Sequence, residues 1–266
     1  MRIVFFGNGW VAYEVLRYLK SQGEEIAGLV LHAPERQSVG DKIAAESGIP
    51  KEHTFFGPDL RDPSTVEAIQ ALGADIGLSA MFGYILRPEL LAAFPRGVLN
   101  LHPSYLPYNR GRGAEVWSII DKTPVGATLH YMDSGVDTGP IVHQKLVTIE
   151  PTDTGESLRN KLHSACVEVM VEGWPAVAGG RDVAVPQDPE AGNSHRLRDL
   201  DGISRIDLER EYTGAELIDL LRALTSTART RGAYFEKDGK RVYVTLSLNE
   251  EVDLTGESRL DEESRT

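Results

Sequence analysis

Cysteine is nearly absent from this 266-residue chain, which contains one, Cys166. A single cysteine excludes an internal disulfide framework and any zinc cluster built on several cysteines, and it suits a reducing compartment. Long apolar runs are missing as well, since no stretch approaches the roughly 18 uninterrupted apolar residues of a membrane span. The first residues have the pattern of a strand rather than of a signal peptide. We therefore expect a cytoplasmic protein with no membrane partner.

Basic side chains are in the minority, because 28 Lys and Arg face 40 Asp and Glu, a formal net charge of −12. Residues 151–249 carry 13 basic and 16 acidic side chains, and residues 250–266 carry seven acids and two arginines. A nucleic-acid backbone is held by a basic surface, so we expect no nucleic-acid partner. The acidic tail 250–266 is expected to be disordered.

Alternating apolar runs and helical patterns predict an α/β fold with a Rossmann-like, mostly parallel sheet. A strand over residues 1–6, a glycine turn, a helix through residue 20 and a strand over 26–31 form a βαβ unit, which implies a right-handed crossover. The pattern continues with helices near 65–72, 88–93 and 113–121 and with apolar runs at 75–80, 98–102 and 125–132. These elements predict a catalytic domain over residues 1–178.

The composition changes near Pro151. Residues 153–156 predict a capping box in which Asp153 begins a helix that ends near Pro175. Residues 179–193 are rich in Gly, Pro and Asp and indicate a connection. A small C-terminal α+β unit is then expected over residues 179–249, with a helix beginning at Thr213 and strands over 233–236 and 241–248 joined in a hairpin at Asp238-Gly239.

A glycine turn, Gly7 to Ala12, follows the first strand and fits the pattern G-x-G-x-x-A. Such a turn allows backbone N–H groups and a helix dipole to approach an anion. A dinucleotide site also requires a carboxylate after the second strand, but the residue there is His32, and Glu35 follows a proline. Three interpretations stay open: an NAD-binding oxidoreductase, a phosphate-bearing substrate on the turn, and a turn needed only for packing.

Asn100 and His102 stand two residues apart at the end of a predicted strand, directly before Pro103. They should project to the same side, at the carboxyl edge where open α/β sheets bind ligands. A polar loop, residues 132–140, contains Asp137 and can bring a carboxylate to the histidine. Each feature alone is also compatible with a structural role, so the spacing by itself leaves the function open.

Taken together, residues 100–107 and 135–141 resemble the paired signature of the folate-dependent formyltransferases, and the resemblance extends over about residues 1–175. Members of that family move a formyl group from 10-formyltetrahydrofolate to an amine. The resemblance implies that Asn100, His102 and Asp137 form the catalytic set. It implies folate binding by Met81, Phe82, Gly83, Tyr84, Ile85, Leu86, Asp133 and Gly135.

The chemistry of formyl transfer explains these residue types. Attack of an amine on the formyl carbon creates a tetrahedral oxyanion, which the Asn100 amide and a protonated or donating His102 would stabilise, each by on the order of 3 kcal/mol. Asp137 would raise the pKa of His102 and assist in removing the amine proton. No metal is expected, because His130 and His143 flank the Asp137 loop without a third clustered ligand.

Two segments, residues 105–117 and the hairpin 232–244, resemble the sugar N-formyltransferases. Those enzymes act on nucleotide-linked amino sugars and frequently dimerise, so we expect a dTDP-4-amino-4,6-dideoxyhexose as acceptor and a homodimer through the hairpin. The hairpin docking on its own domain is the alternative. Acceptor contacts are expected from Asn8, Gly9, Trp10, Tyr105 and Arg110, the last through a diphosphate.

Other acceptors within the family stay open. A methionyl-tRNA formyltransferase normally has a larger, basic C-terminal domain, and a glycinamide ribonucleotide enzyme would end near residue 200. Another small amine is the remaining alternative.

Overall fold

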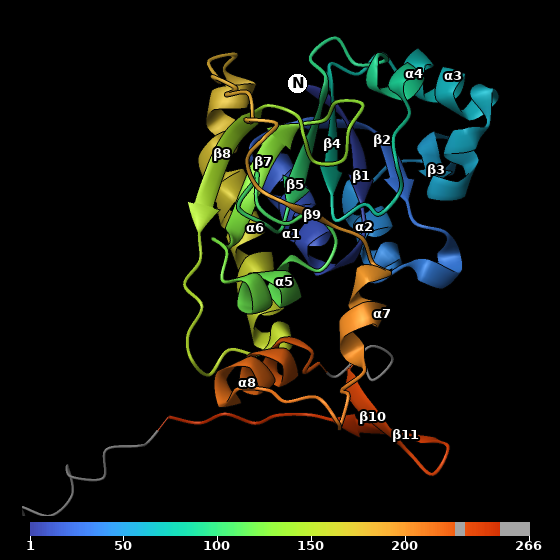
Figure 1. Cartoon of the computed structure of the whole chain (residues 1–266). Helices are drawn as coiled ribbons and strands as arrows, with labels where there is room; N and C mark the ends of the chain where they lie inside the picture. Colours follow the sequence, from blue (N-terminus) through green and yellow to red (C-terminus); the bar gives the residue numbers. More distant parts are fainter. Residues whose placement is uncertain (227–231, 251–266) are drawn as a thin grey trace, which may run out of the picture.

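A seven-stranded sheet forms the centre of the molecule, with the strand order β3-β2-β1-β4-β5-β7-β8 (Figure 1). The computed structural model describes residues 1–226 and 232–250. The strands of the sheet are β1 (Arg2–Gly7), β2 (Glu25–Leu31), β3 (Thr54–Phe56), β4 (Ile76–Ala80), β5 (Val98–His102), β7 (Gly126–Tyr131) and β8 (Ile141–Leu146). Neighbours from β3 to β5 are parallel, whereas β7 and β8 are antiparallel additions. The predicted α/β fold with a mostly parallel sheet is confirmed.

Strand β1 shows how the layers form. Ile3 and Phe5 pack on one face, in the core that contains α1, α2 and α6, and Val4 and Phe6 pack on the other, with α3 and α4. Since both faces are covered, the strand is continuously apolar, as in other parallel sheets. The helices are α1 (Gly9–Ser21), α2 (Gly40–Ser47), α3 (Pro63–Ala71), α4 (Pro88–Leu91), α5 (Ala114–Asp121) and α6 (Gly155–Ala178), with 3-10 turns η1 (Pro34–Arg36), η2 (Lys51–His53) and η3 (Gly57–Arg61).

Loops cover the part of the α3–α4 face that β5 and β7 form. The loop after β5 folds back so that the Leu106 N–H donates to Thr128 of β7 and the Thr128 hydroxyl donates to the Ser104 carbonyl. The loop after β7, residues 132–140, lies on the same face, and residues 185–195 run outside it, as Figure 1 shows for the segment that leads to β9. The site described below lies beneath these loops.

Helix α6 continues to Ala178, past the end near Pro175 that the sequence predicts. Pro175 has no N–H to donate to the carbonyl of Val171, which would normally end the helix. The Tyr18 hydroxyl of α1 donates to that carbonyl at 3.3 Å instead. The capping box is also shifted by one residue, since Thr154 rather than Asp153 is the N-cap and its partner is Ser157.

The C-terminal unit shares its core with the first domain. It contains α7 (Asp199–Ser204), α8 (Gly214–Ala223) and the hairpin of β10 (Ala233–Lys237) and β11 (Lys240–Val244), whereas β9 (Ser194–His195) pairs with β6 (Arg110–Gly111). Leu200, Ala223 and Ala233 are buried against α5 and the first turns of α6. Strand β11 ends at Val244, before the predicted residue 248. The predicted tail lies, apart from residue 250, outside the described residues.

Over residues 1–226 and 232–250, no helix has both the length and the apolar composition to cross a membrane.

Candidate active site

Strands β5 and β7 present four polar side chains on one face of the sheet. In the antiparallel register, Asn100 lies directly opposite His130, and His102 lies directly opposite Thr128. Residues opposite each other in an antiparallel pair project to the same face. Leu99, Leu101, Ala127 and Leu129, which alternate with them, belong to the core on the other face. The polar side chains of the site thus project from β5 and β7 on one face of the sheet.

Asp137 lies on the loop after β7, which begins at the end of the sheet where β5 starts. Because β7 runs antiparallel to β5, the loop after it begins beside the first residue of β5, where the Met132 N–H donates to the Val98 carbonyl. An Asx turn shapes the loop, since Asp133 Oδ1 accepts from the Gly135 N–H at 2.9 Å and the Thr138 hydroxyl at 2.6 Å. The carboxylate therefore meets Asn100 and His102 on one face of the sheet, at the carboxyl end of β5, as the sequence predicts for these two residues.

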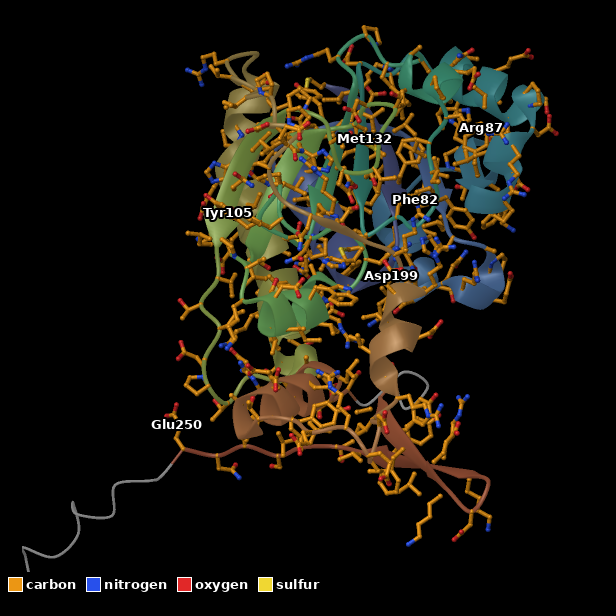
Figure 2. The ribbon with its side chains drawn as sticks, viewed as in Figure 1. Phe82, Arg87, Tyr105, Met132, Asp199 and Glu250 are labelled. Carbon is orange, nitrogen blue, oxygen red and sulfur yellow. The ribbon has the colours of Figure 1, made fainter. Side chains whose placement is uncertain are left out.

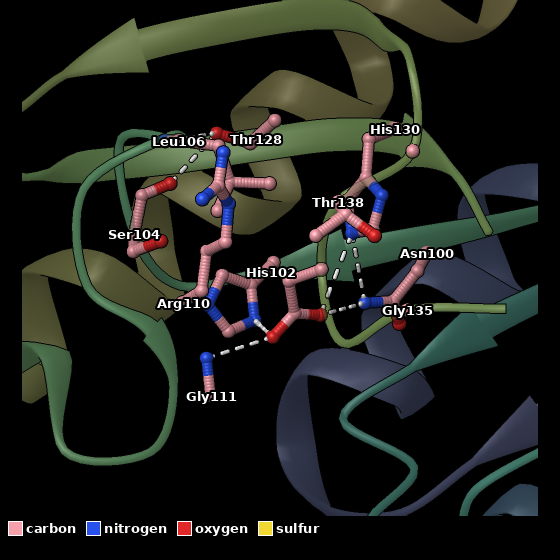
Figure 3. Close-up of polar contacts among 12 residues, drawn as sticks. Asn100, His102, Ser104, Leu106, Arg110, Gly111, Thr128, His130, Gly135 and Thr138 are labelled. Atoms are coloured by element: carbon pink, nitrogen blue, oxygen red, sulfur yellow. Dashed lines mark hydrogen bonds and ion pairs between the residues drawn. The ribbon is translucent and has the colours of Figure 1, made fainter. Parts of the chain in front are cut away.

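Four groups converge on the Asp137 carboxylate. Its Oδ2 accepts from the Gly111 N–H at 2.9 Å and lies 3.5 Å from His102 Nδ1. Its Oδ1 lies 3.4 Å from Asn100 Nδ2 and 3.7 Å from His130 Nε2. Figure 3 shows these four residues turned toward one point. The structure thus brings the predicted set together and adds His130 and Gly111 to it.

Asp137 is ionised and His102 is neutral at pH 7. Burial opposes the charge on Asp137, but the His102 and His130 rings and the Gly111 N–H outweigh it and hold the pKa of this carboxyl well below its usual range. Burial lowers the pKa of His102, and Asp137 only partly offsets it, since His130 and Arg112 also disfavour the cation. Asp137 thus acts in the predicted direction, but the net shift of the His102 pKa is downward, because a ring so completely covered is governed by desolvation.

His130 fixes the orientation of the Asn100 amide. Its Nδ1 lies 2.8 Å from the Tyr131 carbonyl, which only accepts, so Nδ1 carries a proton, and in the neutral ring Nε2 presents a lone pair. Asn100 Nδ2 lies 3.2 Å from Nε2 and donates to Asp137 Oδ1 at 3.4 Å. The amide nitrogen, rather than the amide oxygen, thus faces the Asp137 carboxylate and the space beside it.

The predicted folate loop, residues 81–86, follows β4 and is held at Gly83. The Gly83 N–H donates to His32 Nε2 at 3.0 Å, and the Gly83 carbonyl accepts from Arg112 Nη2 at 3.3 Å. Burial and the charges of Arg112 and Arg36 lower the pKa of His32, which keeps this acceptor neutral.

The side chains of this loop point in different directions. Phe82 and Tyr84 pack edge-on against the His32 ring, and Leu86 is buried. Ile85 is 82% exposed, and Met81 adopts a left-handed backbone conformation with φ 56°. Ile85 is thus the most exposed apolar side chain of the loop, whereas Met81, Phe82 and Tyr84 are partly buried.

The polar groups of the glycine turn already form hydrogen bonds with other parts of the chain. The Asn8 and Gly9 N–H groups donate to the carbonyls of Ala80 and Ser38, and the Asn8 side-chain oxygen accepts from the Ser38 N–H at 2.8 Å. Trp10, in contrast, is 59% exposed. Of the three predicted acceptor contacts at this turn, Trp10 is the one with a free side chain.

Arg110 and Tyr105 lie away from the position expected for an acceptor contact. Arg110 is 8% exposed, and its guanidinium donates to Gln187 Oε1 and to the Asp188 carbonyl. The prediction that it binds a diphosphate is therefore not retained. Tyr105 is half-buried and lies on the β8 side of the sheet, whereas Phe82 lies on the β2 side (Figure 2).

Comparison with known proteins identifies the chain. Residues 1–173 match the family model described as "Formyl transferase", and residues 199–250 match an "N-formyltransferase dimerization C-terminal domain". The chain belongs to the formyl transferase family. The resemblance drawn from the two sequence motifs is thereby confirmed.

Relatives of this formyl transferase differ in the acceptor that their names give. A methionyl-tRNA formyltransferase of Chloroflexus aurantiacus is 35% identical over 199 residues, which cover 71% of this chain and 63% of that protein. The chain thus spans less than two thirds of that relative. A 4-N formyltransferase from Francisella tularensis has the same fold, with a TM-score of 0.80 and 24% identity, covering 94% of this chain and 98% of that one.

A third relative was solved with ligands. The formyltransferase PseJ from Anoxybacillus kamchatkensis, in complex with UDP-4,6-dideoxy-4-formamido-L-AltNAc and tetrahydrofolate, is 25% identical to this formyl transferase, with a TM-score of 0.55. The match covers 76% of this chain and 89% of that one.

Sequence reasoning about this formyl transferase missed four residues that the structure places around the site: His32, Arg112, His130 and Gln187. His130 could have been found by aligning β7 antiparallel to β5, which places it opposite Asn100. The other three carry no local signal, since His32 and Arg112 meet only at Gly83 and Gln187 lies in a connection rich in Pro and Gly. Among the described residues, no group of three or more His, Cys, Asp and Glu side chains could hold a metal ion.

Proposed function

We propose that this chain transfers the formyl group of 10-formyltetrahydrofolate to a primary amine. The observation that carries the proposal is the convergence of Asn100 and His102 on the Asp137 carboxylate in a member of the formyl transferase family. PseJ, a relative solved with tetrahydrofolate, supports a folate donor.

In this proposal the neutral His102 accepts the proton that the amine loses as its nitrogen bonds to the formyl carbon. The ionised Asp137, 3.5 Å away, stabilises the imidazolium that forms. The longer contact of Asn100 Nδ2, at 3.4 Å, is the one that the developing oxyanion can replace, so the amide donates to the tetrahedral intermediate. The C–N10 bond then breaks, and the proton on His102 passes to the N10 atom of tetrahydrofolate. The residues carry out proton transfer and charge stabilisation without a covalent enzyme intermediate.

The loop 81–86 and the turn of Asp133 and Gly135 are proposed to hold the folate. Both lie on the face that carries Asn100, one after β4 and the other after β7. The hydrogen bonds of Gly83 to His32 and Arg112 fix the first loop, and the Asx turn of Asp133 fixes the second. Because both loops are already fixed, little conformational entropy is lost when the folate binds between them.

We propose a nucleotide-linked amino sugar as the acceptor, with dTDP-4-amino-4,6-dideoxyhexoses as the first candidates. Two findings support this class: the UDP-linked formamido sugar bound in PseJ and the match of residues 199–250 to a domain of N-formyltransferases. The exposed ring of Trp10, beside the glycine turn, is proposed to contact the sugar or its base.

A methionyl-tRNA acceptor is the second candidate, and the identity of 35% to the Chloroflexus protein favours it. A tRNA partner needs basic surface, however, and residues 151–249 carry 13 basic against 16 acidic side chains. We therefore place the sugar first.

The C-terminal hairpin is proposed to form a homodimer. Val242 and Tyr243 of β11 are each more than two-fifths exposed, in a segment that matches a dimerization domain. Light scattering of the purified chain should give twice the monomer mass, and Tyr243→Asp should return it to the monomer mass.

A panel assay tests the proposed function. Release of tetrahydrofolate from 10-formyltetrahydrofolate is followed with nucleotide-linked 4-amino and 3-amino sugars, glycinamide ribonucleotide, ornithine and charged initiator tRNA. Turnover on one sugar nucleotide alone supports the whole proposal, whereas turnover on tRNA alone would replace the acceptor. Failure to bind 5-formyltetrahydrofolate in calorimetry would overturn the folate donor itself.

A further inference from the structure

The segment between α6 and α7 is fastened onto the candidate active site. Val185 bridges Ile141 at the start of β8, and β9 pairs with β6, the two-residue strand that contains Gly111. Between these two anchors lies Gln187. The segment thus runs directly over the loop that carries Asp137.

Every polar atom of the Gln187 side chain has a partner in that region. Its Nε2 donates to the Asp137 carbonyl at 2.9 Å and to the Gly139 carbonyl at 2.8 Å. Its Oε1 accepts from Nε and Nη2 of Arg110, at 3.1 and 2.9 Å. Arg110 is buried, so one amide connects a fixed guanidinium to the main chain on both sides of Thr138.

The main chain at Asp137 needs such support. Its φ is +56°, in the left-handed region, which strains residues other than glycine, although Asp tolerates it better than most. The same residue is held at its other end, since its carboxylate accepts from the Gly111 N–H. Hydrogen bonds therefore connect two parts of Asp137 to β6. The carboxylate is bound directly by Gly111, and the main-chain carbonyl is linked to Arg110 through Gln187.

We propose that Gln187 is a positioning residue for formyl transfer: by linking Arg110 to the carbonyls of Asp137 and Gly139, it holds the Asp137 carboxylate against His102. This inference rests on the catalytic role proposed above for Asp137. Gln187 itself touches no reacting atom. The competing explanation is that Gln187 only fastens the connecting segment to the domain.

An isosteric substitution separates these two roles. Gln187→Glu keeps the size of the side chain and the acceptor for Arg110, but it has no hydrogen to donate to the carbonyls of Asp137 and Gly139. A fastening role predicts lower stability but near-normal kcat in the folded enzyme, because a carboxylate oxygen repels the two carbonyls that the amide NH2 group held. A positioning role predicts a fall in kcat of roughly 10²-fold with smaller changes in KM, since misplacement by about 1 Å has that effect.

A second measurement needs no acceptor substrate. Gln187→Leu removes all four hydrogen bonds without changing charge, and the pKa of His102 is followed by NMR titration of its ring C–H. The charged and titratable groups that act on His102 are Asp137, His130 and Arg112. Displacement of the carboxylate should lower the His102 pKa further. Arg96→Met, which loses hydrogen bonds at the opposite edge of the sheet, is the control for destabilisation alone.

The results decide between the explanations. The proposal is overturned if Gln187→Glu turns over like the wild type, or if Gln187→Leu leaves the His102 titration where Arg96→Met leaves it. Asp137→Asn is measured in parallel. If it too is fully active, the mechanism proposed for the site fails, whereas an inactive Asp137→Asn beside active Gln187 variants refutes only the role of Gln187.

Discussion

Replacement of Asp137 by asparagine removes one charge and leaves the shape of the site almost unchanged. Asparagine is among the residues that tolerate a left-handed backbone, so the φ of +56° at this position can be kept. Substitution by alanine would remove the carboxylate and would also strain the left-handed backbone at this position. Asp137→Asn therefore tests the charge rather than the fold of the loop.

The magnitude follows from one distance. Asp137 Oδ2 lies 3.5 Å from His102 Nδ1. With an effective dielectric constant of about 20, opposite unit charges at that separation attract by roughly 5 kcal/mol. The attraction develops only as His102 takes the amine proton, so its loss raises the barrier rather than weakening substrate binding. We expect kcat to fall ~10³-fold, since each 1.36 kcal/mol corresponds to about a factor of ten.

Steady-state release of tetrahydrofolate measures this effect, with thermal unfolding as the check on folding. Asp182→Asn is a matched control, because its carboxylate is similarly buried and accepts a hydrogen bond from Tyr131 at the opposite edge of the sheet. The control should retain kcat within a few-fold. A folded Asp137→Asn enzyme within tenfold of the wild type would refute the stabilisation of His102 by Asp137.

Three further outcomes follow from the same contacts. The proposed mechanism requires neutral His102, whose pKa is lowered by burial, so kcat/KM should hold to below pH ~6.5 and fall only at more acid pH; an acid limb above pH 7 would contradict this. His32→Leu leaves the Gly83 N–H without its acceptor and should raise KM for the formyl donor roughly tenfold at constant kcat, unlike a general loss of fold. Tyr18→Phe removes the donor to the Val171 carbonyl and should lower the free energy of unfolding by about 1 kcal/mol in urea; no change would show that water replaces the hydroxyl.

Elements with a strong period or a strong turn signal could be predicted from the sequence. Strand β1 and helix α1 have a continuous apolar run and a helical stripe on either side of the glycine turn, and the hairpin has Asp238-Gly239. In these segments the local preference and the tertiary environment agree. Local agreement of this kind is what makes an element predictable.

Other elements depend on contacts that are distant in sequence. Strand β3 has three residues, and β8 is half-buried along most of its length, so neither shows a clear pattern. The end of α6 is the most instructive difference. Proline at 175 predicts an end, but α6 continues to Ala178, and the hydroxyl of Tyr18, 153 residues before Val171, donates to the Val171 carbonyl that the proline leaves without a partner in the helix.

The candidate site divides in the same way. The spacing of Asn100 and His102 places them on one face, and the family motif adds Asp137. The contribution of His130 depends on the antiparallel register of β7, and that of Gln187 depends on the path of a connection with no pattern of its own. The residues proposed to react could thus be brought together from the sequence, whereas the residues that support them could not.

The protonation state of His102 shows why this division matters for the mechanism. A pairwise argument from the sequence places a carboxylate beside an imidazole and expects the pKa of the imidazole to rise. The structure adds the loops that cover the ring, and burial then favours the neutral form over the cation. A neutral ring beside an ionised Asp137 is ready to take a proton, whereas a charged ring could only donate. In the proposed mechanism the layer of loops therefore makes this pair begin the reaction as a base, and the amine loses its proton efficiently only while those loops hold His102 against Asp137.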